Sequence, residues 1–170
     1  MASLLLISGL RSDSSRPPLM PSQNPIILLL EDCPVTAMLV ERVILQGLPA
    51  CRLMWARTVA EARERSSSIQ IDLFIVDIVL PDGSGLDFLG HAAFAHPSAC
   101  AIVVTATALP EYQAMSAALG ALHFIEKPAK PPVLLEQIRR ALGSQSSTGS
   151  ARDFRATLEN VTPTFSNSSG

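Results

Sequence analysis

The sequence predicts an α/β protein built on a doubly wound sheet of five parallel strands. Between residues 24 and 143, short apolar runs alternate with amphipathic stretches of helical length, the pattern of successive strand-helix units. The chain of 170 residues is 48% hydrophobic and only 16% charged, so it has ample apolar material for a sheet that helices cover on both faces. We therefore expect one domain with a real core and a tail at each end.

Five strands are predicted along this stretch. The first is a continuous aliphatic run, which is typical of a strand buried on both faces. The second is short, and the others are apolar runs that end at polar residues. In order, they are expected at Ile26–Leu30, Arg52–Trp55, Asp72–Val76, Ala101–Val104 and Leu122–Ile125.

A helix is predicted after each strand. In the second helix, Thr58 and Glu61 have the spacing of a capping box, which marks a helix start. The first helix gathers Val35, Met38, Leu39 and Val43 on one face, and the fifth turns Leu135, Ile138 and Leu142 inward. The five helices are expected from Pro34 to Gly47, from Thr58 onward, at Leu86–Ala95, at Pro110–Leu119 and from Pro132 onward.

The two ends of the chain differ in composition from the middle. Residues 1–23 are rich in Ser, Pro and Arg and are predicted to be a disordered lead; whether translation starts at Met1 or Met20 is left open. Residues 144–170 begin as a Ser- and Gly-rich linker and continue as a short tail, in which ARDFRATLENV either forms a short helix or stays disordered. The predicted domain is therefore residues 24–143.

Charge and cysteine content exclude several classes of function. The net charge is -2 and no block of Lys and Arg occurs, which argues against binding nucleic acid or an anionic membrane. Cys33, Cys51 and Cys100 are widely spaced and form no CxxC pair, so neither a disulfide framework nor a zinc site is indicated. The apolar run at residues 4–7 is far too short to span a membrane. We expect a cytoplasmic protein.

Polar residues follow the predicted strands at their carboxyl ends, the edge where open α/β sheets bind ligands. Three carboxylates gathered there would repel one another unless a cation were present, and Mg²⁺ suits a site with few carboxylates and a phosphate oxygen. A lysine and a threonine add an ammonium and a hydroxyl that an incoming oxyanion can use. The set matches phosphoryl transfer to a carboxylate nucleophile, and consists of Glu31, Asp32, Asp77, Thr105 and Lys127.

Residues 24–143 resemble the receiver domain of two-component response regulators, in particular the stand-alone, chemotaxis-regulator-like type. The resemblance implies a flavodoxin-like (βα)5 fold with strand order 2-1-3-4-5. Taken together the motifs are highly specific, although each alone would be weak. They are ED at 31–32, VDIVLPDGSGLDF at 76–88, VVTATA at 103–108 and ALGALHFIEKP at 118–128.

The resemblance implies a phosphoacceptor and a metal site. Asp77 would take a phosphoryl group from a phosphohistidine donor. Asp32 and Asp77 would bind Mg²⁺ directly, the backbone carbonyl of Val79 would be a third ligand, and Glu31 would act through water. Side chains at Val79 and Thr107 cannot orient an attacking water well, so we expect slow autodephosphorylation and no other enzymatic activity.

The resemblance also implies a switch. Thr105 would move to the phosphoryl oxygen, Lys127 would pair with it, and Phe124 would occupy the aromatic switch position. The Lys127–Pro128 bond is expected to be cis, a form available at low cost only before proline. Phosphorylation would then change the surface formed by the fourth helix, fifth strand and fifth helix.

The implied partners are a sensor histidine kinase or a histidine phosphotransfer protein, and a downstream protein target that the sequence does not identify. The chain is expected to be a monomer or a phosphorylation-dependent dimer. An alternative is a pseudo-receiver, an interaction module that is not phosphorylated. A hydrolase of the haloacid dehalogenase type would need an aspartate where Val79 stands, and a flavodoxin-type phosphate loop would need Ser, Thr and Gly where EDCP stands.

Overall fold

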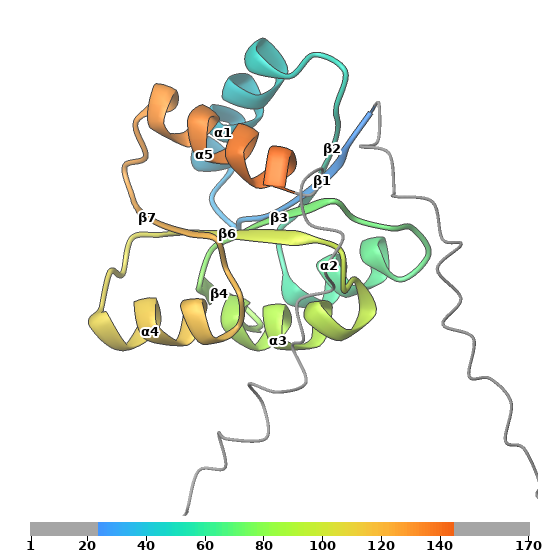
Figure 1. Ribbon diagram of the computed structural model, residues 1–170. Helices are drawn as coiled ribbons and strands as arrows, with labels where there is room; N and C mark the ends of the chain where they lie inside the picture. The colour runs from blue at the N-terminus through green and yellow to red at the C-terminus, as the bar shows by residue number, and fades with distance from the viewer. Residues whose placement is uncertain (1–23, 145–170) are drawn as a thin grey trace, which may run out of the picture.

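The computed structural model describes residues 24–144, which form a central sheet with helices on both faces (Figure 1). The predicted N-terminal lead, its possible start at Met20 and the segment 151–161, expected to be either a short helix or disordered, lie outside the described residues. The domain boundary at 143 stays a prediction, although the last helix runs through Ser144 and so includes the first residue of the predicted linker. None of the helices in residues 24–144 has the length and apolarity needed to cross a bilayer.

The main sheet confirms the predicted architecture. Its five strands are all parallel and lie in the order β2-β1-β3-β6-β7, which is 2-1-3-4-5 when only these strands are counted. The central strands β1 and β3 are almost wholly apolar and buried, as strands with helices on both faces should be. The strands are β1 Ile26–Leu30, β2 Arg52–Ala56, β3 Leu73–Val76, β6 Cys100–Thr105 and β7 His123–Glu126.

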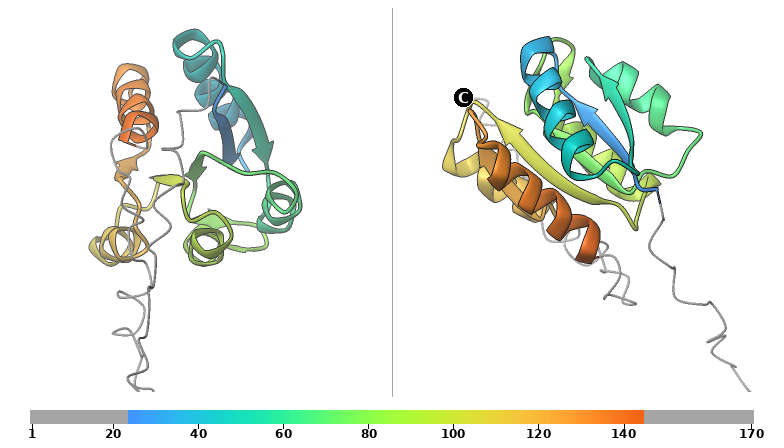
Figure 2. Two further views of the ribbon diagram at one scale, coloured as in Figure 1. Left: turned by 45° about the vertical axis from the view of Figure 1, so that its right-hand side comes forward. Right: turned by 90° about the horizontal axis from the view of Figure 1, so that it is seen from above.

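Five helices cover the two faces (Figure 2). One face carries α1 and α5, and the other carries α2, α3 and α4, so two apolar clusters form, one on each side of the sheet. The helices are α1 Pro34–Gly47, α2 Val59–Ser66, α3 Gly85–Ala95, α4 Pro110–Ala118 and α5 Pro131–Ser144.

The apolar face predicted for α1 is not the face that packs on the sheet. Val35, Met38 and Leu39 are 75%, 65% and 41% exposed, and only Val43 of the predicted set is buried. The buried face consists of Ala37, Val40, Val43 and Ile44. The helix therefore has two apolar stripes, and the small Ala37 belongs to the inner one because it allows α1 to lie close to the sheet.

A short hairpin between β3 and α3 was not predicted. Its strands, β4 Val79–Leu80 and β5 Gly83–Ser84, pair antiparallel within the segment read from the sequence as a loop. Asp82 in its turn accepts hydrogen bonds from the backbone N–H groups of Val59 and Ala60, at 2.8 and 2.9 Å. The hairpin is thus fastened to the first turn of α2.

The start of α2 confirms the predicted capping box. The backbone N–H of Glu61 donates to Thr58 Oγ1 at 3.1 Å, and the Glu61 carboxylate accepts from the backbone N–H of Arg57 at 3.0 Å. Together with Asp82, these two side chains satisfy the backbone donors that a helix leaves free at its beginning. Because Ala60 and Val59 donate to it, the pKa of Asp82 lies below its ordinary value.

Candidate functional site

The structure brings four of the predicted site residues into one cluster at the carboxyl edge of the sheet. Glu31 and Asp32 follow β1, Asp77 follows β3 and Lys127 follows β7. Carboxylate oxygens of Glu31, Asp32 and Asp77 all lie within 4.8 Å of one another. Residues that are 96 positions apart in the sequence, such as Glu31 and Lys127, meet here because parallel strands end at the same edge.

Asp77 is held by both of its carboxylate oxygens. Its Oδ1 accepts hydrogen bonds from the backbone N–H of Ile78 at 2.6 Å and of Val79 at 3.4 Å. Its Oδ2 accepts from Lys127 Nζ at 2.5 Å. The residue is only 7% exposed, so the partners replace water that burial removes. The side chain is therefore fixed in direction, with one oxygen held by the backbone and the other turned toward the remaining charged groups.

Glu31 and Lys127 form the second half of this ion-pair network. Lys127 Nζ donates to Glu31 Oε2 at 2.6 Å, and the backbone N–H of Cys33 donates to Glu31 Oε1 at 3.2 Å. Burial raises the pKa of Glu31, and the opposing hydrogen bond from Lys127 does not cancel that rise. Burial also lowers the pKa of Lys127, but its bonds to Asp77 and Glu31 outweigh burial and leave that pKa above its ordinary value. The ammonium of Lys127 stays protonated, but its single positive charge does not balance the negative charges of the carboxylates around it.

The donor set fits a hard divalent cation. Asp32 is partly exposed, and no hydrogen bond or ion pair of its carboxylate is found among residues 24–144. It stands beside two buried carboxylates for which Lys127 supplies a single positive charge. All three residues offer oxygen, the ligand that Mg²⁺ takes in proteins. Burial is the main cause of the raised pKa of Glu31, and the nearby Asp77 carboxylate raises it further.

Thr105 and Phe124 lie on β6 and β7, and among residues 24–144 neither side chain hydrogen-bonds to this cluster. Thr105 is fully buried at the end of β6, and its Oγ1 accepts from the backbone N–H of Thr107 at 3.3 Å. No hydrogen bond joins its side chain to Asp77 within the described chain. Phe124 pairs in register with Val103 on the neighbouring strand and packs half-buried against the core. The Lys127–Pro128 peptide bond is cis, the form that the resemblance implies.

The loop after Asp77 passes close to it. Gly85, the first residue of α3, donates its N–H to the carbonyl of Ile78 at 2.9 Å. A Cβ atom at Gly85 would lie 1.9 Å from the backbone oxygen of Asp77, so this position requires a glycine. The predicted ligand residue Val79 lies on β4 between the two, with its side chain 58% exposed.

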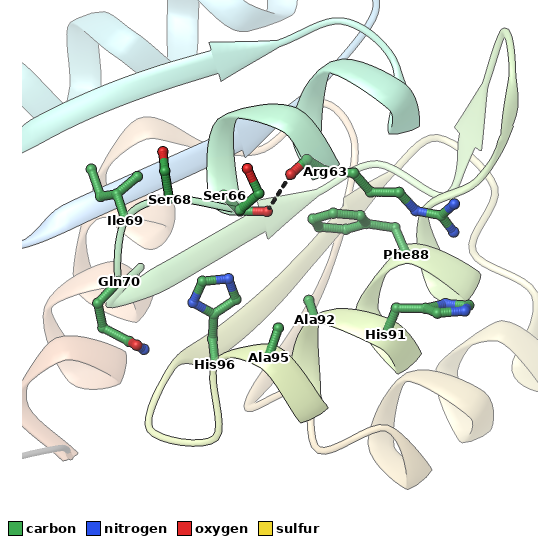
Figure 3. Close-up of a pocket in the computed structure, with 11 residues that line it drawn as sticks. Arg63, Ser66, Ser68, Ile69, Gln70, Phe88, His91, Ala92, Ala95 and His96 are labelled. Atoms are coloured by element: carbon green, nitrogen blue, oxygen red, sulfur yellow. Dashed lines mark hydrogen bonds between the residues drawn. The ribbon is translucent and has the colours of Figure 1, made fainter.

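A hollow lies at the other end of the sheet (Figure 3). It has a volume of about 560 Å³ and is bounded by the end of α2, the segment leading into β3 and the end of α3, with Phe88 and His96 among its lining side chains. None of the residues predicted for the phosphoryl site lines it. Size therefore does not locate the chemistry in this molecule, whereas the gathering of charged groups does.

Two residues that support the site were not singled out from the sequence. Asp82 fastens the hairpin that carries Val79 to α2. Trp55 packs against the core and also donates its indole N–H to the carbonyl of Glu31 at 2.7 Å. The Asp-Gly step at 82–83 signals a turn but not what the carboxylate caps, and no sequence signal points from Trp55 to Glu31.

Comparison with known proteins shows the same family throughout. A family model described as the response regulator receiver domain matches residues 27–139, well over half of the chain. The swarming motility regulation protein RssB of Serratia marcescens is 33% identical over 129 residues, which cover 74% of this chain and 58% of that protein. The response regulator protein PilR of Pseudomonas aeruginosa is 36% identical over 87 residues, which cover 51% of this chain and 20% of PilR. The chain thus spans less than two thirds of the length of either curated relative.

Solved structures agree with the fold. A CheY-like response regulator receiver domain protein from Methanospirillum hungatei JF-1 is 27% identical with a TM-score of 0.68, and the match covers 73% of this chain and 98% of that one. The non-phosphorylated HemR receiver domain from Leptospira biflexa is 30% identical with a TM-score of 0.62, and covers 70% and 94% of the two chains.

Proposed function

Because this chain belongs to the response regulator receiver domain family, we propose that it accepts a phosphoryl group on Asp77 from a phosphohistidine donor. The donor would be a sensor histidine kinase or a histidine phosphotransfer protein. The bond between phosphorus and the donor imidazole nitrogen breaks as a bond forms between phosphorus and a carboxylate oxygen of Asp77. The electron pair of the broken bond stays on the imidazole, and the product is an acyl phosphate.

The observation that supports the proposal best is the way Asp77 is held. Its Oδ1 is fixed by the backbone N–H of Ile78 and its Oδ2 lies 2.5 Å from Lys127 Nζ. A carboxylate that is only 7% exposed and oriented at the carboxyl edge of the sheet meets the positioning requirement of phosphoryl transfer. After transfer, the Lys127 ammonium would lie beside the new negative charge, and its raised pKa keeps it protonated there.

We assign Mg²⁺ to the same cluster. Asp32 and Asp77 would hold it directly with the backbone carbonyl of Val79, and Glu31 would hold it through water. When bound, Mg²⁺ supplies positive charge that attracts a phosphoryl oxygen and offsets charge on the transferring group. The grouping of three carboxylates within 4.8 Å, with one ammonium bonded to only two of them, supports this assignment.

Thr105, Lys127 and Phe124 would convert phosphorylation into a change of surface. The Thr105 hydroxyl lies at the end of the strand next to β3, where a donor for a phosphoryl oxygen on Asp77 is needed. Phe124 is half-buried one strand further on, so inward movement of its ring can follow movement of Thr105. The surface of α4, β7 and α5 would then bind an unidentified downstream protein, with the chain acting as a monomer or as a phosphorylation-dependent dimer.

The exposed stripe of α1 fits a docking role for the phosphodonor. Val35, Met38 and Leu39 follow directly after Asp32 and Cys33, so an apolar surface flanks the entrance to the cluster. A donor that must bring its histidine to Asp77 would cover this stripe, which explains large apolar side chains at 75% and 65% exposure.

We also propose a cytoplasmic location, where such kinases hold their donor histidines.

Slow loss of the phosphoryl group follows from two side chains. Val79 is exposed beside the site but is apolar, and Thr107 is half-buried with its backbone N–H already bonded to Thr105. Neither orients a water for attack on the acyl phosphate. Apart from self-catalysed transfer and this slow hydrolysis, we propose no enzymatic activity.

The test is incubation with acetyl phosphate, with and without Mg²⁺, followed by intact mass measurement. The proposal predicts a gain of one phosphoryl group that requires Mg²⁺ and is absent from Asp77→Ala. A matched control is Asp87→Ala, an exposed aspartate in the first turn of α3 that is expected to leave the gain unchanged. No gain in the wild-type chain would support the pseudo-receiver alternative instead.

A further inference from the structure

Trp55 is the only tryptophan of the chain, and it bonds to the backbone of the acidic pair. Its indole Nε1–H donates to the carbonyl oxygen of Glu31 at 2.7 Å, from β2 to the residue that directly precedes Asp32. Register explains the reach: Trp55 pairs with Leu29, two residues before Glu31, so the long side chain must extend along the strands toward their carboxyl ends to meet the Glu31 carbonyl.

The indole N–H of Trp55 supplies a hydrogen bond at the point where backbone hydrogen bonding between β1 and β2 ends. The last bond between these strands runs from the Glu31 N–H to the carbonyl of Ala56 at 3.0 Å. In a continued parallel ladder, the Glu31 carbonyl would accept from the backbone of Thr58. However, β2 ends at Ala56, and Thr58 instead caps α2. Glu31 is only 2% exposed, so its carbonyl needs a donor from the protein, and the indole N–H is that donor.

This bond fixes the peptide that carries Asp32. The side chain of Glu31 is held by Lys127 and by the Cys33 N–H, whereas the Asp32 carboxylate has no such partner among residues 24–144. The direction of Asp32 therefore depends on its backbone, and the Glu31–Asp32 peptide is held by the indole on its carbonyl side. The Arg57 guanidinium lies over the Trp55 ring at 5.9 Å from its centroid and limits the ring's movement outward.

We infer that Trp55 is a positioning residue of the cation site, in which its indole N–H sets the orientation of Asp32 through the Glu31 carbonyl. The inference rests on the proposed function, since it concerns the same Mg²⁺ ligands. Trp55 also packs half-buried with Leu53 against the core, so its ring contributes to stability as well. We attribute the support of Mg²⁺ binding to the indole N–H, rather than to packing of the ring.

The single tryptophan permits a substitution at one atom. Replacing it biosynthetically with its benzothienyl isostere exchanges the N–H for sulfur at position 55 alone and keeps the bicyclic shape. Removing a group that hydrogen-bonds to a metal ligand typically weakens metal affinity by about 10- to 100-fold. We expect the low end of this range, about tenfold weaker Mg²⁺ binding, which calorimetry measures. Trp55→Phe, which also lacks the N–H, should weaken binding by a similar factor.

Leu53→Ala is the matched control, because it removes packing from the same strand and the same apolar cluster but no hydrogen bond to the site. It should lower thermal stability and leave Mg²⁺ affinity within about twofold. Equal Mg²⁺ affinity in the wild-type and isostere proteins would overturn the inference and leave the proposed function standing. Absence of both Mg²⁺ binding and phosphorylation in the wild-type chain would overturn the proposed function, and the inference with it.

Discussion

The two edges of the central sheet both bury polar side chains, but they use them differently. At the amino edge, Asp72 accepts from the backbone N–H of Ile26 at 2.7 Å, and His96 Nδ1 accepts from the backbone N–H of Ile71 at 3.4 Å. Each of these side chains ties two segments of backbone together. At the carboxyl edge, Lys127 bonds to two carboxylates, so side chains there bond to one another across strands.

This difference suggests that polar side chains at the amino edge, the structural edge, serve to hold the fold together. Those at the carboxyl edge, the chemical edge, are arranged to bind a cation. A side chain that bonds to backbone is satisfied by the fold alone, and nothing further has to bind. Three grouped carboxylates, of which only two bond to the single ammonium, remain short of positive charge, so the fold leaves an interaction for a cation to complete. The large hollow of Figure 3 lies at the structural edge, which is why volume is a poor guide to the site.

Removing Lys127 should have the largest effect on stability. Lys127→Ala leaves Glu31 and Asp77 buried without their ammonium, and breaking a buried pair in this way costs about 3–5 kcal/mol of unfolding free energy. Denaturant unfolding with and without MgCl₂ measures both this loss and its partial recovery by the cation. Lys130→Ala, which removes an exposed lysine three residues on, is the matched control. Equal losses in the two variants would contradict the description of a charge-dependent edge.

Gly85→Ala tests how tightly the loop must pass Asp77. The added methyl group would meet a backbone oxygen at 1.9 Å, which cannot move aside as a side chain can, so we expect about 1–3 kcal/mol of destabilisation and slower phosphorylation. Gly143→Ala is the control, because a Cβ there meets nothing within 4 Å. In α5 that substitution should change stability by at most about 1 kcal/mol, in the stabilising direction. A wild-type phosphorylation rate in Gly85→Ala would show that the close approach is unimportant.

The amino edge should show a smaller, pH-dependent effect. Burial lowers the pKa of His96, so the unfolded chain binds a proton more readily than the folded one. Its contribution to stability is full above the ordinary histidine pKa of about 6.5 and is lost as pH falls below it, with a slope of up to about 1.4 kcal/mol per pH unit.

His96→Gln should flatten this slope in denaturant unfolding between about pH 7 and pH 5. His123, whose pKa is lowered by burial and by Arg140, leaves a residual slope of the same sign. If His96→Gln and wild type lose stability equally on acidification, the histidine is not a buried neutral group.

The sequence was sufficient for the sheet and for the identity of the clustered residues. Aliphatic runs of four to six residues that end at Asp, Glu or Thr place both the strands and the edge, because parallel strands bring their carboxyl ends together. It was insufficient for α1, where Val35, Met38 and Leu39 are apolar yet exposed. Apolar character alone does not distinguish a buried face from an exposed apolar one.

Features that depend on very short strands or on contacts between distant segments could not be predicted from the sequence either. Two-residue strands such as Val79–Leu80 carry too little pattern to be recognised. The bonds from Trp55 to Glu31 and from α2 to Asp82 join residues 24 and 22 or 23 positions apart, where neither partner has a local signal.

The central claim is that the charged edge makes Asp77 a phosphoryl acceptor, and the most direct measurement traps the acyl phosphate there. After reaction with acetyl phosphate and Mg²⁺, borohydride reduces an aspartyl phosphate to homoserine, which peptide mass spectrometry locates. The account predicts homoserine at position 77 and nowhere else in the wild-type chain, and none without Mg²⁺. Homoserine at another aspartate, or a phosphoryl group that survives on a histidine or serine instead, would contradict it.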